Sequence, residues 1–213
     1  MSDNFWEIEE ALFGDGFRHI CGVDEAGRGP LAGPVFAAAV ILPPGVNISY
    51  LNDSKKLSES RRSELYNEII NIASAYAVAY ADHSEIDNMN ILNATYLAMN
   101  RAIKLLKITP DIAIIDGNRN SGIEIFSKTV IGGDGKSASI AAASILAKVS
   151  RDRYMLKIAE KYPCYAFEKH KGYGTKLHYE RLNMFGHCEI HRVTFLKKFY
   201  DAQQKISPAD RAN

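Results

Sequence analysis

The order of extended and helical patterns constrains the fold of this chain more than any other feature. Apolar or alternating runs predict strands at residues 20–23, 35–42, 76–80, 112–115 and 123–131. Apolar residues at helical spacing predict helices over residues 65–72 and over residues 92–106, before Pro110. A long helix then begins near Ser137 and continues past Arg153. This order predicts an α/β fold in which helices flank a mixed sheet.

The length allows one full-sized domain and a small appendage. The chain has 213 residues, of which 46% are hydrophobic and 24% are charged, a composition typical of folded proteins. Beyond Pro163 the pattern changes to short helices and loops. We therefore expect a core domain over residues 1–162 and a small C-terminal helical region over residues 163–213.

The charge of the chain is balanced overall but uneven along its length. The formal net charge is +1, which gives no reason to expect a basic, nucleic-acid-binding protein. Residues 148–198, however, contain 12 Lys or Arg against 5 Asp or Glu, whereas residues 1–147 contain 12 against 18. Two solvated faces of different charge explain this split as well as a phosphate-binding segment does.

The cysteines and the N-terminus indicate a cellular location. The three cysteines, Cys21, Cys164 and Cys188, are odd in number and have no C-x-x-C spacing, which favours reduced thiols. The N-terminus has no basic and apolar segments of a signal peptide, and no run approaches the roughly 18 apolar residues of a membrane span. We expect a cytoplasmic monomer that does not contact membranes.

Acidic residues stand at the ends of predicted elements. Asp24-Glu25 and Asp116 follow apolar strands, and Asp134 precedes a helix. Ligands of α/β sheets collect at the carboxyl ends of strands, so these four carboxylates share a site if those ends converge. Their mutual repulsion is tolerable chiefly around a hard divalent cation such as Mg²⁺ or Mn²⁺. Two such ions, roughly 3.5–4 Å apart, are a known arrangement for phosphodiester cleavage.

The adjacent pair Asp24-Glu25 presents a geometric difficulty. Neighbouring residues on a strand point to opposite faces, so both can serve one metal cluster only where the strand ends or bends. The following Ala26-Gly27-Arg28-Gly29-Pro30 permits such a bend. Taken alone, the two acids are also consistent with ordinary polar turn residues.

Two glycine-rich segments resemble phosphate loops but depart from them. Gly27, Gly29 and Gly33 have G-x-G-x-x-x-G spacing and precede a predicted strand, unlike a dinucleotide-binding fingerprint. Residues 132–137 imitate a P-loop, but Val130 occupies the position of its first glycine and Asp134 adds a negative charge. Residues 187–191 contain two histidines and one cysteine, too few for a structural zinc site, and a surface loop is expected there.

Several motifs together resemble the bacterial ribonuclease HII family, which belongs to the type 2 ribonuclease H group. The first is the segment 22–35, GVDEAGRGPLAGPV. Further matches follow in the same order at residues 53–58, 116–118, 133–152, 171–175 and 191–195. The resemblance covers roughly residues 18 to 200.

The resemblance implies a ribonuclease H-like core and an endonuclease that cuts the RNA strand of RNA–DNA hybrids, or DNA duplexes 5′ of a single embedded ribonucleotide. The expected products end in 3′-hydroxyl and 5′-phosphate. Asp24, Glu25, Asp116 and Asp134 match the family's metal-binding and catalytic carboxylates, for Mg²⁺ or Mn²⁺, with two ions in the reactive complex.

The resemblance also implies substrate-binding residues. Gly27-Arg28-Gly29 matches the family's loop that reads the ribose 2′-hydroxyl, the group that separates RNA from DNA. Tyr173 matches the tyrosine that acts with this loop at the RNA–DNA junction, although alone it is equally a packing residue. Lysines are interpreted as phosphate contacts if the fold brings them to the site; these are Lys55, Lys56, Lys169 and Lys171.

Two other functions compete with a metal-dependent endoribonuclease. A nucleic-acid-binding module without catalysis would gain little from acids at three element ends beside a basic segment. A P-loop NTPase is opposed by Val130 and Asp134.

Overall fold

A computed structural model describes residues 5–48, 51 and 57–205, with side chains up to residue 202. A five-stranded sheet of order β3-β2-β1-β4-β5 forms its centre. The strands are β1 (Ile20–Ala26), β2 (Val35–Ile41), β3 (Ala75–Ala81), β4 (Ile112–Asp116) and β5 (Ser127–Val130). β2 is antiparallel to β1 and β3, whereas β4 is parallel to β1 and β5. The sheet is therefore mixed, as the sequence predicts.

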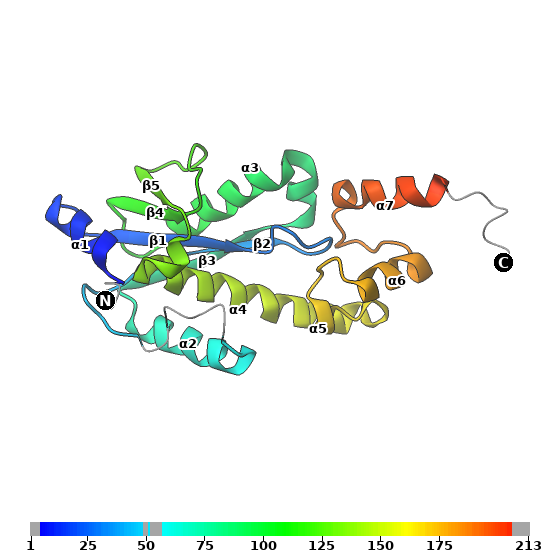
Figure 1. Cartoon of the computed structure of the whole chain (residues 1–213), viewed down its shortest axis with the longest axis horizontal. Helices are drawn as coiled ribbons and strands as arrows, with labels where there is room; N and C mark the ends of the chain where they lie inside the picture. The colour runs from blue at the N-terminus through cyan, green and yellow to red at the C-terminus, as the bar shows by residue number, and fades with distance from the viewer. Residues whose placement is uncertain (1–4, 49–50, 52–56, 206–213) are drawn as a thin grey trace.

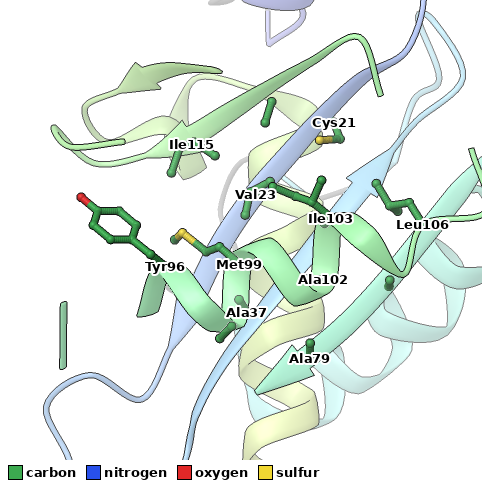
Figure 2. Close-up of a cluster of buried hydrophobic side chains, with 14 of the residues drawn as sticks. Cys21, Val23, Ala37, Ala79, Tyr96, Met99, Ala102, Ile103, Leu106 and Ile115 are labelled. Carbon is green, nitrogen blue, oxygen red and sulfur yellow. The ribbon is translucent and has the colours of Figure 1, made fainter. Parts of the chain in front are cut away.

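Helices cover both faces of the sheet (Figure 1). α3 (His83–Lys104) lies on one face, and α2 (Glu59–Ile72) and α4 (Ala138–Lys161) lie on the other. Figure 2 shows the α3 side chains Tyr96, Met99 and Ile103 beside Val23 and Ile115 of the sheet. A separate apolar cluster joins the opposite face to α4 and α2. This arrangement confirms the predicted sheet with flanking helices.

α3 differs from the predicted helix at its start. It begins at His83, but Asn90 interrupts it with a φ of 70°. The Asn90 side chain accepts hydrogen bonds from the backbone N–H groups of Leu92 and Asn93, at 3.0 and 3.2 Å, and so begins a new helical segment. The apolar spacing that starts at Leu92 therefore predicts only the second segment.

The fifth strand is shorter than predicted, because residues 123–126 form a loop. Asn100 on α3 holds this loop: its Nδ2 donates to the Gly122 carbonyl at 2.8 Å, and its Oδ1 accepts from the Glu124 N–H at 3.1 Å. Ile123 and Ile125 pack against the core beneath α3. Their alternation reflects this packing rather than sheet pairing.

The acidic N-terminal segment forms α1 (Glu7–Gly14), which no periodicity predicts. Glu9 is buried, and its Oε1 accepts from the Ser137 hydroxyl at 2.6 Å and the Ser139 N–H at 3.0 Å. A negative charge at the start of a helix is stabilising. α1 thus fixes the first turn of α4, directly after the 3₁₀ turn η2 (Gly133–Gly135).

The C-terminal region consists of η3 (Pro163–Tyr165), α5 (Phe167–His170), α6 (Lys176–Phe185) and α7 (Val193–Lys205). It shares an apolar cluster with Leu31, with Ala32 and with the end of α4. The loop after β1 is held by backbone hydrogen bonds from the Leu31 N–H to the Gly172 carbonyl, at 2.8 Å, and from the Gly33 N–H to the Ile190 carbonyl, at 2.9 Å. This loop therefore joins the sheet to the C-terminal region. None of the described helices is long and apolar enough to cross a membrane.

Candidate active site

Three of the predicted acids lie at the carboxyl ends of two adjacent parallel strands. The register of β1 and β4 pairs Val23 with Ile115, and Asp24 and Asp116 follow that pair directly. β1 does not end at Val23 but continues through Asp24 and Glu25 to Ala26. Parallel strands present their carboxyl ends at one edge, so the sheet itself brings these acids together.

Asp24 and Glu25 have different partners, as expected of neighbours on a strand. Asp24 is only 6% exposed, accepts from the Glu25 N–H at 2.7 Å and is hydrogen-bonded to Ser144 of α4. Glu25 is half-buried and pairs with the Arg28 guanidinium at 3.2 Å. Gly27, with a φ of 97°, turns the chain immediately after the strand. Both carboxylates thus reach the edge of the sheet although they belong to opposite faces.

The electrostatics of this edge favour a bound cation. Burial raises the pKa of Asp24 well above its usual value, and the charges of Glu25 and Asp116 raise it further. Burial also raises the pKa of Glu25, against the lowering effect of Arg28, and Asp116 raises it again. A divalent cation would relieve this repulsion and supply the hard charge that carboxylate oxygens prefer.

Asp134 lies on η2 and is 6% exposed. The preceding Gly133 N–H donates to Asp116 Oδ1 at 2.7 Å, which ties the turn that carries Asp134 to the end of β4. Within the described part of the chain, no three His, Cys, Asp or Glu residues are arranged to hold a metal ion as they stand. The donor set therefore fits a hard divalent cation by its chemistry and burial, and loading requires side-chain adjustment.

Two fully buried arginines shape the loop after β1. Arg192 donates to the carbonyls of Gly27, Arg28 and Gly33 at 2.6, 2.9 and 2.8 Å. Arg151, on α4, donates to three further carbonyls, those of Ala32, Pro34 and Lys171. A Cβ atom on Gly27 would lie 2.0 Å from Arg151 Nε, so only glycine fits there. The two guanidinium groups fix the loop that contains Gly27-Arg28-Gly29, whose role in reading the ribose stays a prediction.

Tyr173 lies beside this loop. Its ring centroid is 5.6 Å from the Arg151 guanidinium carbon and 5.8 Å from Lys148 Nζ. A cavity of about 340 Å³ connects Tyr173 with Glu25, and Gly27, Arg62, Ser144 and Lys148 are among the residues that line it; we call it the Tyr173 cavity. The structure thus places the predicted tyrosine, the glycine loop and one acid around one cavity.

Three buried histidines form a cluster that contacts the backbone of Tyr173. His178 Nδ1 lies 3.0 Å from the Tyr173 carbonyl, and His178 Nε2 lies 3.0 Å from His191 Nε2. His170 stacks on His178 with ring centroids 4.4 Å apart. Burial lowers the pKa of His178 and of His191 to about 4. The expectation of a surface loop over residues 187–191 is therefore wrong at Ile190 and His191, which are buried in this apolar and imidazole cluster.

The predicted lysines are not part of these contacts. Lys169 is exposed, and Lys171 Nζ donates to the Glu168 carbonyl, while only its backbone carbonyl contacts Arg151. Neither lysine lines the Tyr173 cavity. Lys55 and Lys56 lie outside the described residues. The phosphate-binding role of all four stays a prediction.

Sequence reasoning missed several residues that the structure places at the site: Arg62, Ser144, Lys148, Arg151 and Arg192. Three of them are detectable in principle. Ser144, Lys148 and Arg151 are spaced by four and three positions, which places them on one face of α4. A row of polar residues on an otherwise apolar helix is the sequence feature from which these three could have been predicted as site residues.

The fold and the acids together define a class of protein, the nucleases with a ribonuclease H-like fold. The solved structure of ribonuclease H2 from Pyrococcus horikoshii OT3 matches with a TM-score of 0.70 and 28% identity, over 92% of this chain and 100% of that chain. Bst-RNase HIII, solved in complex with Mn²⁺, matches with a TM-score of 0.63 over 89% of this chain and 71% of its own. At 18% identity, the second likeness concerns the fold alone.

The sequence narrows this class to one family. The family model of ribonuclease HII matches residues 21–198. A ribonuclease HII from Caldicellulosiruptor bescii is 57% identical over 195 residues, which cover 92% of this chain and 95% of the relative. The chain belongs to the ribonuclease HII family and is thus a metal-dependent endoribonuclease, which confirms the resemblance found in its motifs.

Proposed function

We propose that this protein cuts the RNA strand of RNA–DNA hybrids, and DNA duplexes on the 5′ side of a single embedded ribonucleotide, leaving 3′-hydroxyl and 5′-phosphate ends. One observation carries the proposal: the Tyr173 cavity joins a carboxylate of the acidic edge, Glu25, to the glycine loop at Gly27. The hydrolytic groups and the groups suited to read a ribose thus border the same space.

The four acids have a common task in this proposal. Asp24, Glu25, Asp116 and Asp134 hold Mg²⁺ or Mn²⁺, with two ions in the reactive complex. Bound metal supplies an activated water and stabilises the leaving oxygen. Burial of Asp24 and the bond from the Gly133 N–H to Asp116 restrict these two side chains and so limit the adjustment that metal loading requires.

The remaining groups select and orient the substrate. The backbone of Gly27-Arg28-Gly29, which Arg192 holds by the carbonyls of Gly27 and Arg28, is polar and borders the cavity at Gly27, as a reader of the 2′-hydroxyl must. The Tyr173 ring, 40% exposed, offers a flat surface to the adjoining sugar. Arg62 and Lys148 line the same cavity and are placed to contact phosphates.

We also propose that the protein acts as a monomer in the cytoplasm. All three cysteines are free, with Cys21 buried in the core, which suits a reducing compartment. The competing P-loop interpretation of residues 132–137 finds no support, because the Gly133 N–H donates to a carboxylate, at the position where a P-loop would cradle phosphate.

The test compares the wild type with Asp24→Asn on a DNA duplex that carries one ribonucleotide, in Mg²⁺ or Mn²⁺. We expect the variant to lose cleavage by a factor of at least 1,000, because one metal ligand is neutralised, while its affinity for the duplex in fluorescence anisotropy stays within about threefold. Metal-dependent cutting by Asp24→Asn at a rate near that of the wild type contradicts the proposal.

A further inference from the structure

A second cavity borders the acidic edge on the side away from Tyr173. It has a volume of about 360 Å³, within the range of small-molecule sites, and lies between α3 and the loop that follows β4. Its lining includes Leu92, Tyr96 and Met99 of α3, Arg28, and Asn118 and Arg119 of the loop. We call it the Tyr96 cavity. The Tyr173 cavity is lined by residues of α2 and α4, whereas the Tyr96 cavity is lined by residues of α3, which covers the opposite face of the sheet (Figure 1). Glu25 is the one residue that lines both, so the two cavities lie on either side of the sheet edge that carries it.

The loop that forms one wall of the Tyr96 cavity is held in place. Asn100, 8% exposed, binds both the Gly122 carbonyl and the Glu124 N–H. A Cβ atom on Gly122 would lie 2.3 Å from Cδ2 of Tyr96, so the loop backbone lies directly on the tyrosine ring. Asn120 Nδ2 donates to the Ser127 carbonyl and hydroxyl, both at 2.9 Å. Asn118 and Arg119 are therefore presented by an anchored loop.

The Tyr96 side chain is a polar group without a partner. The residue is 7% exposed, and its hydroxyl is buried with no hydrogen bond to any described residue. Figure 2 shows the phenol directed away from the neighbouring apolar side chains. Buried hydroxyls nearly always find a partner, since an unmade hydrogen bond is costly. Tyr96 lines the cavity, so a small rotation of its side chain would bring the covered hydroxyl to a ligand there.

The cavity also has an arginine, Arg119, whose charge is not neutralised by an ion pair among the described residues. Arg119 is exposed at its rim and forms no ion pair with another residue that the structure describes. Arg28 also lines the cavity, and its ion pair among the described residues is with Glu25. Guanidinium groups suit a phosphate, while Leu92 and Met99 offer an apolar surface to a sugar or base.

We propose that the Tyr96 cavity binds the nucleotide immediately 5′ of the scissile phosphate, with Arg119 contacting the phosphate on its 5′ side and the Tyr96 hydroxyl contacting its sugar or base. This inference rests on the proposed function, in which Tyr173 takes the ribose on the 3′ side of the cut. A strand cut at the acids is continuous across them, so its 5′ part must leave on the other side of Glu25. The Tyr96 cavity lies on that side.

The test is a cycle that combines Arg119→Ala with neutral substrate phosphates. Duplexes with one ribonucleotide carry a methylphosphonate either one step 5′ or one step 3′ of the scissile phosphate. Arg119→Ala is expected to raise KM about tenfold on the unmodified duplex, with little change in kcat. On the 5′-modified duplex the variant and the wild type should have nearly equal KM, whereas on the 3′-modified duplex the tenfold difference should persist. Equal effects of Arg119→Ala on all three duplexes overturn the proposal.

Two further variants complete the test. Lys128→Ala removes an exposed cation of β5 outside both cavities, and it should leave KM unchanged on every duplex. Tyr96→Phe removes only the hydroxyl and should raise KM about threefold without lowering thermal stability, because the lost group has no hydrogen-bond partner among the residues that the structure describes. An unchanged KM for Tyr96→Phe contradicts the assigned role of the hydroxyl.

Failure of the proposed function would look different. A wild type that cuts none of the duplexes refutes that function. In that case, anisotropy with the Asp24→Asn variant still measures the cavity. Equal affinities for the unmodified and the 5′-modified duplex then overturn the proposal, and weaker binding of the 5′-modified duplex alone supports it.

Discussion

Replacing Asp24 by asparagine should stabilise the fold while it abolishes activity. The carboxylate is 6% exposed and is bonded to the Glu25 N–H and to Ser144. Asparagine has the same shape and keeps an oxygen for the Glu25 N–H, so it retains that contact. It removes a buried negative charge that Glu25 and Asp116 repel. The variant therefore loses an unfavourable interaction and few favourable ones.

Burial and the two neighbouring acids raise the pKa of Asp24 well above 3.8, so its ionised form opposes folding. The size of the effect is taken from the usual range for single substitutions of buried groups, about 1–3 kcal/mol. We expect Asp24→Asn to raise the free energy of unfolding by about 1–3 kcal/mol at pH 8 in the absence of divalent metal. For a chain of this length, this corresponds to roughly 2–10 °C in Tm.

The change of stability with pH offers a second way to test the sign of this effect. A carboxyl whose folded pKa is raised keeps its proton in the native state while the unfolded state has lost it. Stability therefore falls as pH rises from the unfolded pKa of Asp24, near 3.8, through its higher folded value. Asp24→Asn should consequently gain little over the wild type at pH 3.5 and most at pH 8. Urea unfolding at both pH values, with EDTA present, measures this difference.

Divalent metal should reverse the order of the two proteins. Mn²⁺ binds the native wild type and raises its Tm, whereas the variant lacks one ligand and should respond less. Ser139→Ala is a control, because the Ser139 backbone N–H, and not its side chain, binds Glu9. Its response to Mn²⁺ should match that of the wild type. If Asp24→Asn is less stable than the wild type in EDTA at pH 8, the argument from buried charge is refuted.

Three further changes test the support of the site. Gly27→Ala should destabilise the fold by about 1–3 kcal/mol and reduce cleavage, because its Cβ would lie 2.0 Å from Arg151 Nε and its φ is 97°. The control is Gly29→Ala, whose Cβ would meet nothing within 4 Å and which should be nearly neutral in unfolding experiments. Arg192→Lys should lower kcat/KM at least tenfold on a ribonucleotide duplex, because a lysine ammonium cannot replace the planar guanidinium that binds three carbonyls. Wild-type kinetics of this variant would show that the loop does not need the guanidinium. Between pH 7 and pH 5 the contribution of His178 to stability should fall by about 2 kcal/mol, because its folded pKa is about 4 while the unfolded state binds a proton below about 6.5. Acids with a raised pKa, such as Asp24, act in the opposite direction in both proteins, so the measurement is the difference between the wild type and His178→Gln, and His178→Gln should lose less stability over this range.

The strands and the acids were predictable because they depend on local patterns. Residues 20–23 and 112–115 are apolar throughout, and each run ends in an acid that the parallel register then places at the same edge. The loop at residues 123–126 was not predictable in this way. Its alternation is that of a strand, and Asn100, more than twenty positions away, helps to hold it out of the sheet.

The supports of the site depend on contacts between distant residues. Arg192 binds the carbonyl of Gly27, 165 positions away, and Arg151 binds that of Pro34, 117 positions away. No pattern in the sequence marks Arg192, and the spacing that groups Arg151 with Ser144 and Lys148 does not indicate which carbonyls Arg151 binds. The buried pairing of His178 with His191 is equally invisible in the sequence, because no periodicity relates a residue of α6 to the segment before α7. Contacts between polar groups far apart in the chain therefore cannot be predicted from the sequence alone.

The most direct test of the account is to map the cut in a DNA duplex with one ribonucleotide, with Mg²⁺, with Mn²⁺ and with EDTA. We predict one incision on the 5′ side of the ribonucleotide in either metal, with 3′-hydroxyl and 5′-phosphate ends, and none in EDTA. An incision that persists in EDTA, or one that leaves a 2′,3′-cyclic phosphate on the ribonucleotide, would contradict a metal-dependent site built on the four acids, Asp24, Glu25, Asp116 and Asp134.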